Sequence, residues 1–107
     1  MTDSTAIAIV TTIGTEAEAQ KLAKELVAAK LVACAQISLI ESIYHWDGEV
    51  QQDKEFQVRF KTIATNYKAV ETAILERHSY DLPQIYAIAL PEIYEPYAEW
   101  VAENSVE

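Results

Sequence analysis

The alternation of apolar and polar residues predicts an early buried strand followed by an amphipathic helix. Residues 5–12, TAIAIVTT, form a short apolar run rich in β-branched residues, which is typical of a buried strand. Thr15 and Glu18 then have the spacing of a capping box, which marks the start of a helix. A helix over about residues 16–29 would carry one apolar stripe, made of Ala19, Leu22, Ala23, Leu26 and Val27.

Two long extended segments follow, residues 31–46 and 49–63, on either side of Asp47-Gly48. This dipeptide is typical of a two-residue hairpin turn, which fixes the register of the two strands. With that turn, four opposed pairs share one face of the ribbon: Leu39–Phe56, Ile37–Val58, Ala35–Phe60 and Glu41–Lys54. Three of these pairs are apolar and one has opposite charges, so the register agrees with the hydrophobic pattern.

The remainder of the chain predicts a second helix, a last strand and a closing helix. These are expected at residues 66–78, at residues 85–90 and from Pro96 onward. Tyr97, Trp100 and Val101 are expected on the inner side of the closing helix. The order is therefore βαββαβ plus a terminal helix. This is an α+β fold with the ferredoxin-like split β-α-β plan, in one domain over residues 1–107.

The predicted hairpin is too long for the rest of the domain to cover. Each strand could span about 15 residues, whereas strands of five or six are typical. The outer half would therefore project from the body with Ile40, Tyr44 and Trp46 on one face. Exposed rings on an extended ribbon favour aggregation unless another chain covers them. We therefore interpret these three residues as contacts between subunits of a homo-oligomer rather than as a ligand cage.

Composition narrows the classes of partner. The chain has a formal net charge of -9, which makes nucleic acid and an anionic membrane surface unfavourable partners. A single cysteine excludes an intramolecular disulfide. The N-terminal residues lack a signal-peptide pattern, and no run approaches the ~20 apolar residues of a membrane span. We expect a cytoplasmic protein.

Several stretches together resemble the CutA family of divalent-cation tolerance proteins. They are LVACAQI (31–37), ESIYHWDGEV (41–50), Glu55 with Lys61-Thr62, HSYDLPQI (78–85) and YAEWV (97–101). The resemblance implies a ferredoxin-like homotrimer, similar in architecture to PII signalling proteins, whose long hairpins wrap around neighbouring subunits. It also implies a link to copper and other divalent cations, and no established catalytic activity. The chain departs from the family pattern at Gln36, Ser79 and Glu49, where Asn, Pro and Lys are common.

Three residues are candidate metal ligands. Cys34 lies opposite Lys61 in the predicted register, and a nearby ammonium would favour the thiolate, although a free cysteine can equally be a packed core residue. His78 and Asp81 are three residues apart at a helix end and could share an ion, but a capping role suits the histidine as well. One cysteine and two histidines cannot form a closed zinc site within one chain. A site shared between subunits would favour Cu²⁺ among divalent ions.

Three functional hypotheses follow. The first is a non-enzymatic trimer of the CutA type that binds divalent metal weakly, copper in particular, without an obligatory cofactor. The alternative is a PII-like regulatory trimer that binds a small anionic ligand between subunits through Lys61 and Arg59, with Glu55 facing the same cleft. The third is an enzyme with Cys34 as nucleophile and His78 as base. No motif for a metalloprotease, a phosphate loop or a catalytic triad supports an enzyme.

Overall fold

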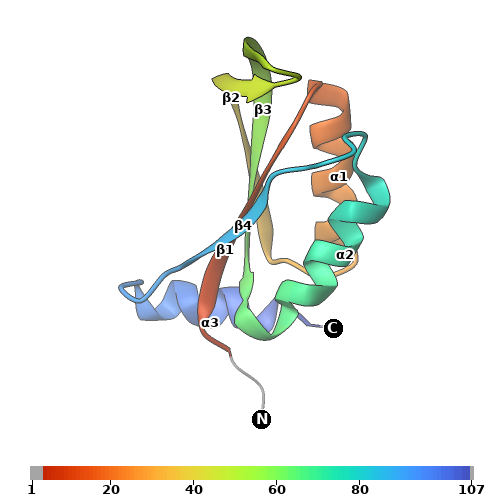
Figure 1. Ribbon diagram of the computed structural model, residues 1–107. Helices are drawn as coiled ribbons and strands as arrows, with labels where there is room; N and C mark the ends of the chain where they lie inside the picture. The colour runs from red at the N-terminus through yellow and green to blue at the C-terminus, as the bar shows by residue number, and fades with distance from the viewer. Residues whose placement is uncertain (1–3, 107) are drawn as a thin grey trace.

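The computed structural model describes residues 4–106, which form one four-stranded antiparallel sheet with three α-helices (Figure 1). The elements are β1 (Ala6–Ile13), α1 (Glu16–Ala28), β2 (Cys34–Trp46), β3 (Glu49–Ile63), a 3₁₀ turn (Ala64–Asn66), α2 (Tyr67–Arg77), β4 (Ile85–Ala89) and α3 (Glu95–Glu103). The strand order is β2-β3-β1-β4. The predicted βαββαβ order with a terminal helix is confirmed, and it is the ferredoxin-like arrangement.

Local signals set the two ends of α1. The Thr15 hydroxyl oxygen accepts a hydrogen bond from the Glu18 backbone N–H at 3.2 Å, as the capping pattern predicts. At the other end Lys30 has a φ of 59°, and the Leu31 N–H bonds the Leu26 carbonyl at 3.2 Å. This six-to-one bond is the Schellman stop, here with a lysine in the left-handed position that glycine usually occupies. Among the described residues, no helix is long and apolar enough to cross a membrane.

The core lies between the sheet and the pair α1 and α2, which lie side by side on one face (Figure 1). Ile9, Val58 and Phe60 project from the strands toward Leu26 and Ile74 of the helices, and all five side chains are fully buried. Because successive strand residues alternate between faces, the neighbours of these strand residues point to the opposite side of the sheet. That opposite face is left open over much of its area, with α3 covering its end nearest the start of β1.

The Asp47-Gly48 turn sets the register of the ribbon. Both residues have positive φ, 55° and 78°, as a two-residue hairpin turn of type I′ requires. All four predicted pairs are present, among them Leu39 opposite Phe56. The expected attraction between opposed Glu41 and Lys54 is not realised as an ion pair in residues 4–106. The Glu41 carboxylate instead accepts a hydrogen bond from the Gln52 amide at 3.0 Å.

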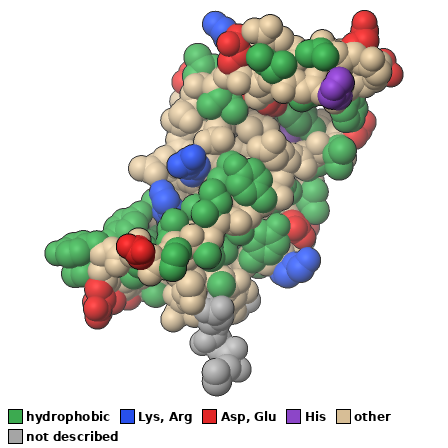
Figure 2. All heavy atoms as spheres, turned by 60° about the vertical axis from the view of Figure 1, so that its left-hand side comes forward, with side chains coloured by type: hydrophobic (Ala, Val, Ile, Leu, Met, Phe, Trp, Pro, Cys, Tyr) green, Lys and Arg blue, Asp and Glu red, His purple; other side chains and the backbone are tan. Residues whose placement is uncertain are grey.

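The outer half of the ribbon projects from the body as an arm, which we define as residues 39–56. The molecule is 44 Å long and only 26 Å and 23 Å across, and Figure 1 shows the ribbon extending beyond the helices. Leu39, Ile43 and Trp46 on the arm have exposed fractions of 59%, 65% and 53%. Figure 2 shows hydrophobic side chains over the arm and a second group lower on the same face. The predicted exposure of the arm is therefore confirmed.

The helices differ from the predictions in two details. Only Val101 of α3 is buried, whereas Tyr97 and Trp100 stack on each other at 5.8 Å and are 36% and 43% exposed. The second helix is also shorter than predicted, because α2 ends at Arg77 and His78 has extended backbone angles. His78 therefore lies beyond the last helical turn, where its side chain is free to bond another element.

Candidate functional site

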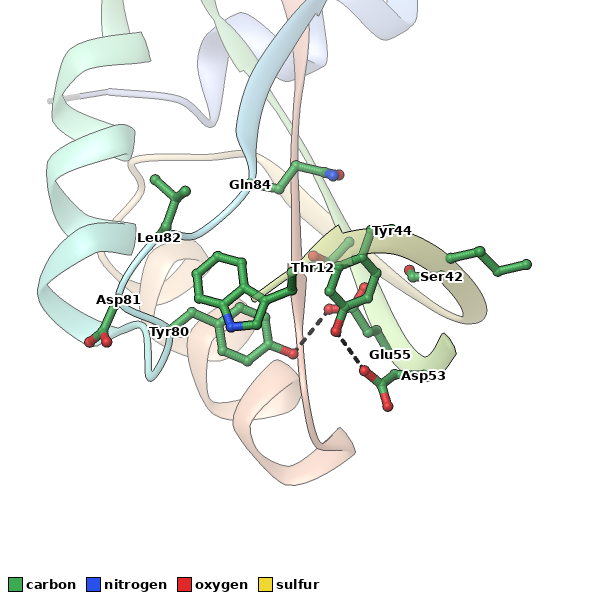
Figure 3. Close-up of a pocket in the computed structure, with 11 residues that line it drawn as sticks. Thr12, Ser42, Tyr44, Asp53, Glu55, Tyr80, Asp81, Leu82 and Gln84 are labelled. Carbon is green, nitrogen blue, oxygen red and sulfur yellow. Dashed lines mark hydrogen bonds between the residues drawn. The ribbon is translucent and has the colours of Figure 1, made fainter. Parts of the chain in front are cut away.

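A pocket of about 700 Å³ lies where the arm meets the end of β1 and the loop between α2 and β4 (Figure 3). Its lining combines three carboxylates with three aromatic rings and several small or neutral side chains. The lining residues are Thr12, Ser42, Ile43, Tyr44, Trp46, Asp53, Glu55, Tyr80, Asp81, Leu82 and Gln84. The set comes from the end of β1, the two strands of the arm and the loop after α2, so the fold is needed to bring the loop and β1 to the arm.

Glu55 is the most buried charged residue of this pocket. It lies on β3 opposite Ile40 and has an exposed fraction of 9%. One of its carboxylate oxygens accepts a hydrogen bond from the Tyr80 hydroxyl at 3.0 Å. Glu55 takes part in none of the ion pairs formed by residues 4–106. Among these residues, the side chain that bonds the Glu55 carboxylate is therefore a neutral donor.

His78 holds Tyr80 in place. The Nε2 atom of His78 lies 2.7 Å from the Thr12 carbonyl oxygen, which can only accept, so Nε2 carries a hydrogen. The Nδ1 atom accepts the Tyr80 backbone N–H at 3.1 Å, and the two rings lie 4.9 Å apart. A Cβ at Gly14 would lie 3.3 Å from the Tyr80 hydroxyl, so this glycine leaves room for the ring. The histidine thus ties the loop to β1 and directs Tyr80 toward Glu55.

Both tyrosine hydroxyls in the pocket act as donors to carboxylates. Burial, together with the hydrogen bond and the charge of Glu55, raises the pKa of Tyr80 to about 12. The Tyr44 hydroxyl donates to Asp53 at 2.5 Å, and this bond is the main cause of a raised pKa for Tyr44. Each phenol therefore keeps its proton at neutral pH and stabilises a neighbouring carboxylate (Figure 3).

Cys34 lies away from this pocket, at the start of β2 beside α3. Its sulfur is 3.6 Å from the Tyr97 hydroxyl, and burial followed by this contact raises the pKa of Tyr97 to about 12. Lys61 lies opposite Cys34 as predicted, but its ammonium donates to the Gln36 side chain at 2.8 Å. Lys61 therefore bonds an amide oxygen, and the hydrogen-bond partner of the thiol is a tyrosine.

The predicted metal ligands do not meet within one chain. Cys34 contacts Tyr97, His78 uses both ring nitrogens for Thr12 and Tyr80, and Asp81 lines the pocket. In residues 4–106 no group of three or more His, Cys, Asp or Glu side chains is placed to hold a metal ion. The idea that His78 serves as a base for Cys34 is therefore wrong for a single chain. A metal site shared between subunits stays a prediction.

The predicted anion cleft is also divided within one chain. Glu55 lines the pocket, whereas Arg59 and Lys61 lie further along β3 and do not line it. Arg59 donates to the neighbouring Gln57 amide at 3.1 Å. The pocket itself is rich in carboxylates, which disfavours an anionic ligand there.

Of the three predicted interface residues, Tyr44 and Trp46 line the pocket and Ile40 is half-buried outside its lining. Whether they contact another subunit stays a prediction. Sequence reasoning missed Tyr80, the residue that completes the pocket. Its position depends on the His78–Thr12 bond, which spans 66 residues of sequence. The available signal was an aromatic residue in the loop between the second helix and the last strand.

The chain is similar to known proteins over nearly its whole length. The family described as "CutA1 divalent ion tolerance protein" matches residues 7–104. A divalent-cation tolerance protein CutA from Thermococcus kodakarensis is 35% identical, covering 91% of this chain and 93% of the relative. Its counterpart from Thermus thermophilus is 33% identical, covering 91% and 95%.

Solved structures agree with the sequence comparison. CutA1 from the psychrotrophic bacterium Shewanella sp. SIB1 has a TM-score of 0.92 at 34% identity, covering 99% of this chain and 100% of that one. CutA from Synechococcus elongatus also has a TM-score of 0.92 at 30% identity, covering 99% of this chain and 95% of that one. A structure described as a periplasmic divalent cation tolerance protein CutA, from Archaeoglobus fulgidus, has a TM-score of 0.92 at 30% identity. The match covers 94% of this chain and 99% of that one.

We expect Tyr80→Phe to destabilise the fold by roughly 1–2 kcal/mol, because it removes the hydroxyl that donates a hydrogen bond to a buried carboxylate. Tyr67→Phe is the matched control. The Tyr67 hydroxyl donates to Glu71 at 2.7 Å, but that carboxylate is 29% exposed and lies near Lys68. Its loss should cost less than half as much. Chemical denaturation of both variants measures the difference, and equal losses would contradict a special role for the Tyr80–Glu55 bond.

Proposed function

Because this chain belongs to the CutA1 family of divalent ion tolerance proteins, we propose that it acts as a non-enzymatic homotrimer that binds divalent metal weakly, with Cu²⁺ preferred. The observation that carries the metal proposal is the placement of Cys34. Its thiol is half-buried, is the one thiol in the sequence, and has a neutral hydroxyl as its hydrogen-bond partner. A thiolate is a ligand suited to soft or borderline metals.

A second subunit would be needed to complete such a site. His78 would have to give up a bond to Thr12 or to Tyr80 before binding an ion, so it is a weaker candidate than Cys34. Asp81 is remote from Cys34 in the single chain, since it lines the pocket on the arm side. We therefore assign Cys34 as the main ligand, with carboxylates or a histidine from a neighbouring chain completing the coordination.

The arm supports the assembly part of the proposal. Its exposed apolar side chains, including Ile43, Tyr44 and Trp46, would remain in contact with water in a monomer. Burying them against a second chain gains hydrophobic free energy and removes an aggregation hazard. The free thiol of Cys34 fits a reducing compartment, so we propose the cytoplasm as the location. The Archaeoglobus fulgidus relative is described as periplasmic.

The PII-like alternative has less support. Arg59 and Lys61 lie on the open face and are bonded to the neutral amides of Gln57 and Gln36, so their charges are available to an anion. However, the pocket under the arm is lined by Glu55, Asp53 and Asp81 and by no basic residue. An anionic ligand would need a cleft that only the assembly creates.

For the assembly, light scattering at micromolar concentration should give three times the 12.0 kDa chain mass. Trp46→Ala should then lower the thermal midpoint, because a buried interface ring contributes roughly 2 kcal/mol or more per site. Tyr94→Ala is the control, since this ring is exposed on the loop before α3 and lies off the arm. A monomeric mass with native circular dichroism would disprove the trimer. Equal thermal midpoints for Trp46→Ala and Tyr94→Ala would show that Trp46 is not an interface contact.

For the metal, anaerobic calorimetry with Cu²⁺ should show at least a tenfold loss of affinity in Cys34→Ser. His45→Ala should change little, because this arm histidine is exposed and lies near the opposite end of β2 from Cys34. Affinity should fall as the pH is lowered, since a thiol must lose its proton to bind a metal. Unchanged copper binding in Cys34→Ser combined with His78→Ala would show that surface carboxylates hold the ion, and the proposed site would be wrong.

A further inference from the structure

The pocket under the arm carries negative charge that nothing in the described chain neutralises. Asp53, Glu55 and Asp81 line it, and none of the lining residues is Lys, Arg or His. Glu55 is nine-tenths buried, and a buried carboxylate is costly unless a cation or several donors compensate it. In the part of the chain that the structure describes, the neutral Tyr80 hydroxyl donates to one of the two oxygens. The arrangement therefore has a place for a positive charge.

Aromatic rings surround that place. Tyr44 and Trp46 come from β2, and Tyr80 comes from the loop before β4. Figure 3 shows the Tyr44 and Tyr80 rings converging from two elements, with their hydroxyls directed toward Asp53 and Glu55. The faces of such rings attract cations, most strongly when the cation is partly desolvated. The hydroxyls of both tyrosines are already used by carboxylates, so the ring faces are what remains to meet a ligand.

A bare metal ion does not fit this lining well. Hard divalent ions need several oxygen ligands converging within bonding distance. The carboxylates here do not form such a group, and Figure 3 shows Asp81 at the outer side, away from Glu55 and Asp53. A larger cation that also has an apolar body can contact Glu55 and the rings at once. A volume of about 700 Å³ is within the range of small-molecule pockets.

We propose that this pocket binds a small organic cation with N–H groups, a primary ammonium or a guanidinium, with Glu55 as its counter-ion and Tyr44, Trp46 and Tyr80 around it. The second oxygen of Glu55 accepts the N–H bond, which a quaternary ammonium cannot donate. This site shares no residue with the Cys34 metal site of the proposed function. It shares Tyr44 and Trp46 with the proposed subunit interface, so one face of each ring must stay open to the pocket in the assembled protein. It does not require that the metal proposal is correct.

Benzylamine and agmatine are suitable probes, with benzyl alcohol as the neutral analogue and tetramethylammonium as a cation without N–H. A Trp100→Phe background leaves Trp46 as the single tryptophan, so its fluorescence reports on the pocket. Calorimetry at low ionic strength on the assembled protein gives the affinity. We expect both amines to bind saturably with a Kd of ~1 mM or lower. Benzyl alcohol and tetramethylammonium should bind at least about tenfold more weakly.

Glu55→Gln keeps the shape of the side chain and its acceptor for Tyr80 but removes the charge, and should weaken amine binding about tenfold or more. Glu99→Gln makes the same charge change at an exposed position on α3 and should leave the affinity within about twofold. Tyr44→Leu, a second variant that leaves Glu55 intact, should weaken binding about two- to fivefold through the lost ring. Circular dichroism verifies that each variant is folded.

Three results would overturn the proposal. The first is that benzyl alcohol binds as tightly as benzylamine, and the second is that Glu55→Gln and Glu99→Gln change the affinity equally. The third is that none of the probes binds. The last outcome includes the case in which a basic side chain of another subunit already neutralises Glu55. Copper binding should be unchanged in Glu55→Gln, and amine binding should be unchanged in Cys34→Ser. The two proposals therefore fail or succeed independently.

Discussion

The register of the long β2–β3 ribbon is the constraint on which the rest of the structure depends. The Asp47-Gly48 turn fixes it, because both residues have the positive φ of a type I′ turn, whose twist matches that of the strands. A slip of one residue would move every side chain of one strand to the other face. Val58 and Phe60 would then leave the core, and Glu55 would turn away from Tyr80.

The two ends of the ribbon serve different purposes. The inner end completes the core beneath α1 and α2, and on its other face it places Cys34 against α3. The outer end is contacted by the loop after α2, which reaches it through Tyr80. That loop is fixed by His78, whose two ring nitrogens connect β1 to the backbone of Tyr80. The pocket therefore depends on a histidine that itself does not line it.

The sequence was sufficient for the fold and the register because the signals were local or periodic. The Asp47-Gly48 turn, the capping threonine and the alternation in the strands each act over a few residues. Helical periodicity predicted which side of α3 faces the sheet but not how much of that side the sheet covers. Val101 is therefore buried, while Tyr97 and Trp100 stay exposed. The pocket could not be predicted, because Tyr80 is placed by bonds between segments distant in sequence. The separation of Cys34 from His78 has the same origin.

A disulfide-trapping experiment on the arm tests the register most directly. Opposed residues in an antiparallel pair have Cα atoms about 4.5–5.5 Å apart, within the range that a disulfide spans. In a Cys34→Ser background, the pair Glu41→Cys with Lys54→Cys should oxidise readily to an intrachain disulfide, seen by mass spectrometry. The pair Glu41→Cys with Glu55→Cys, which lies on opposite faces, should stay reduced. Rapid oxidation of the second pair and not the first would show a slipped ribbon and contradict the account of both the core and the pocket.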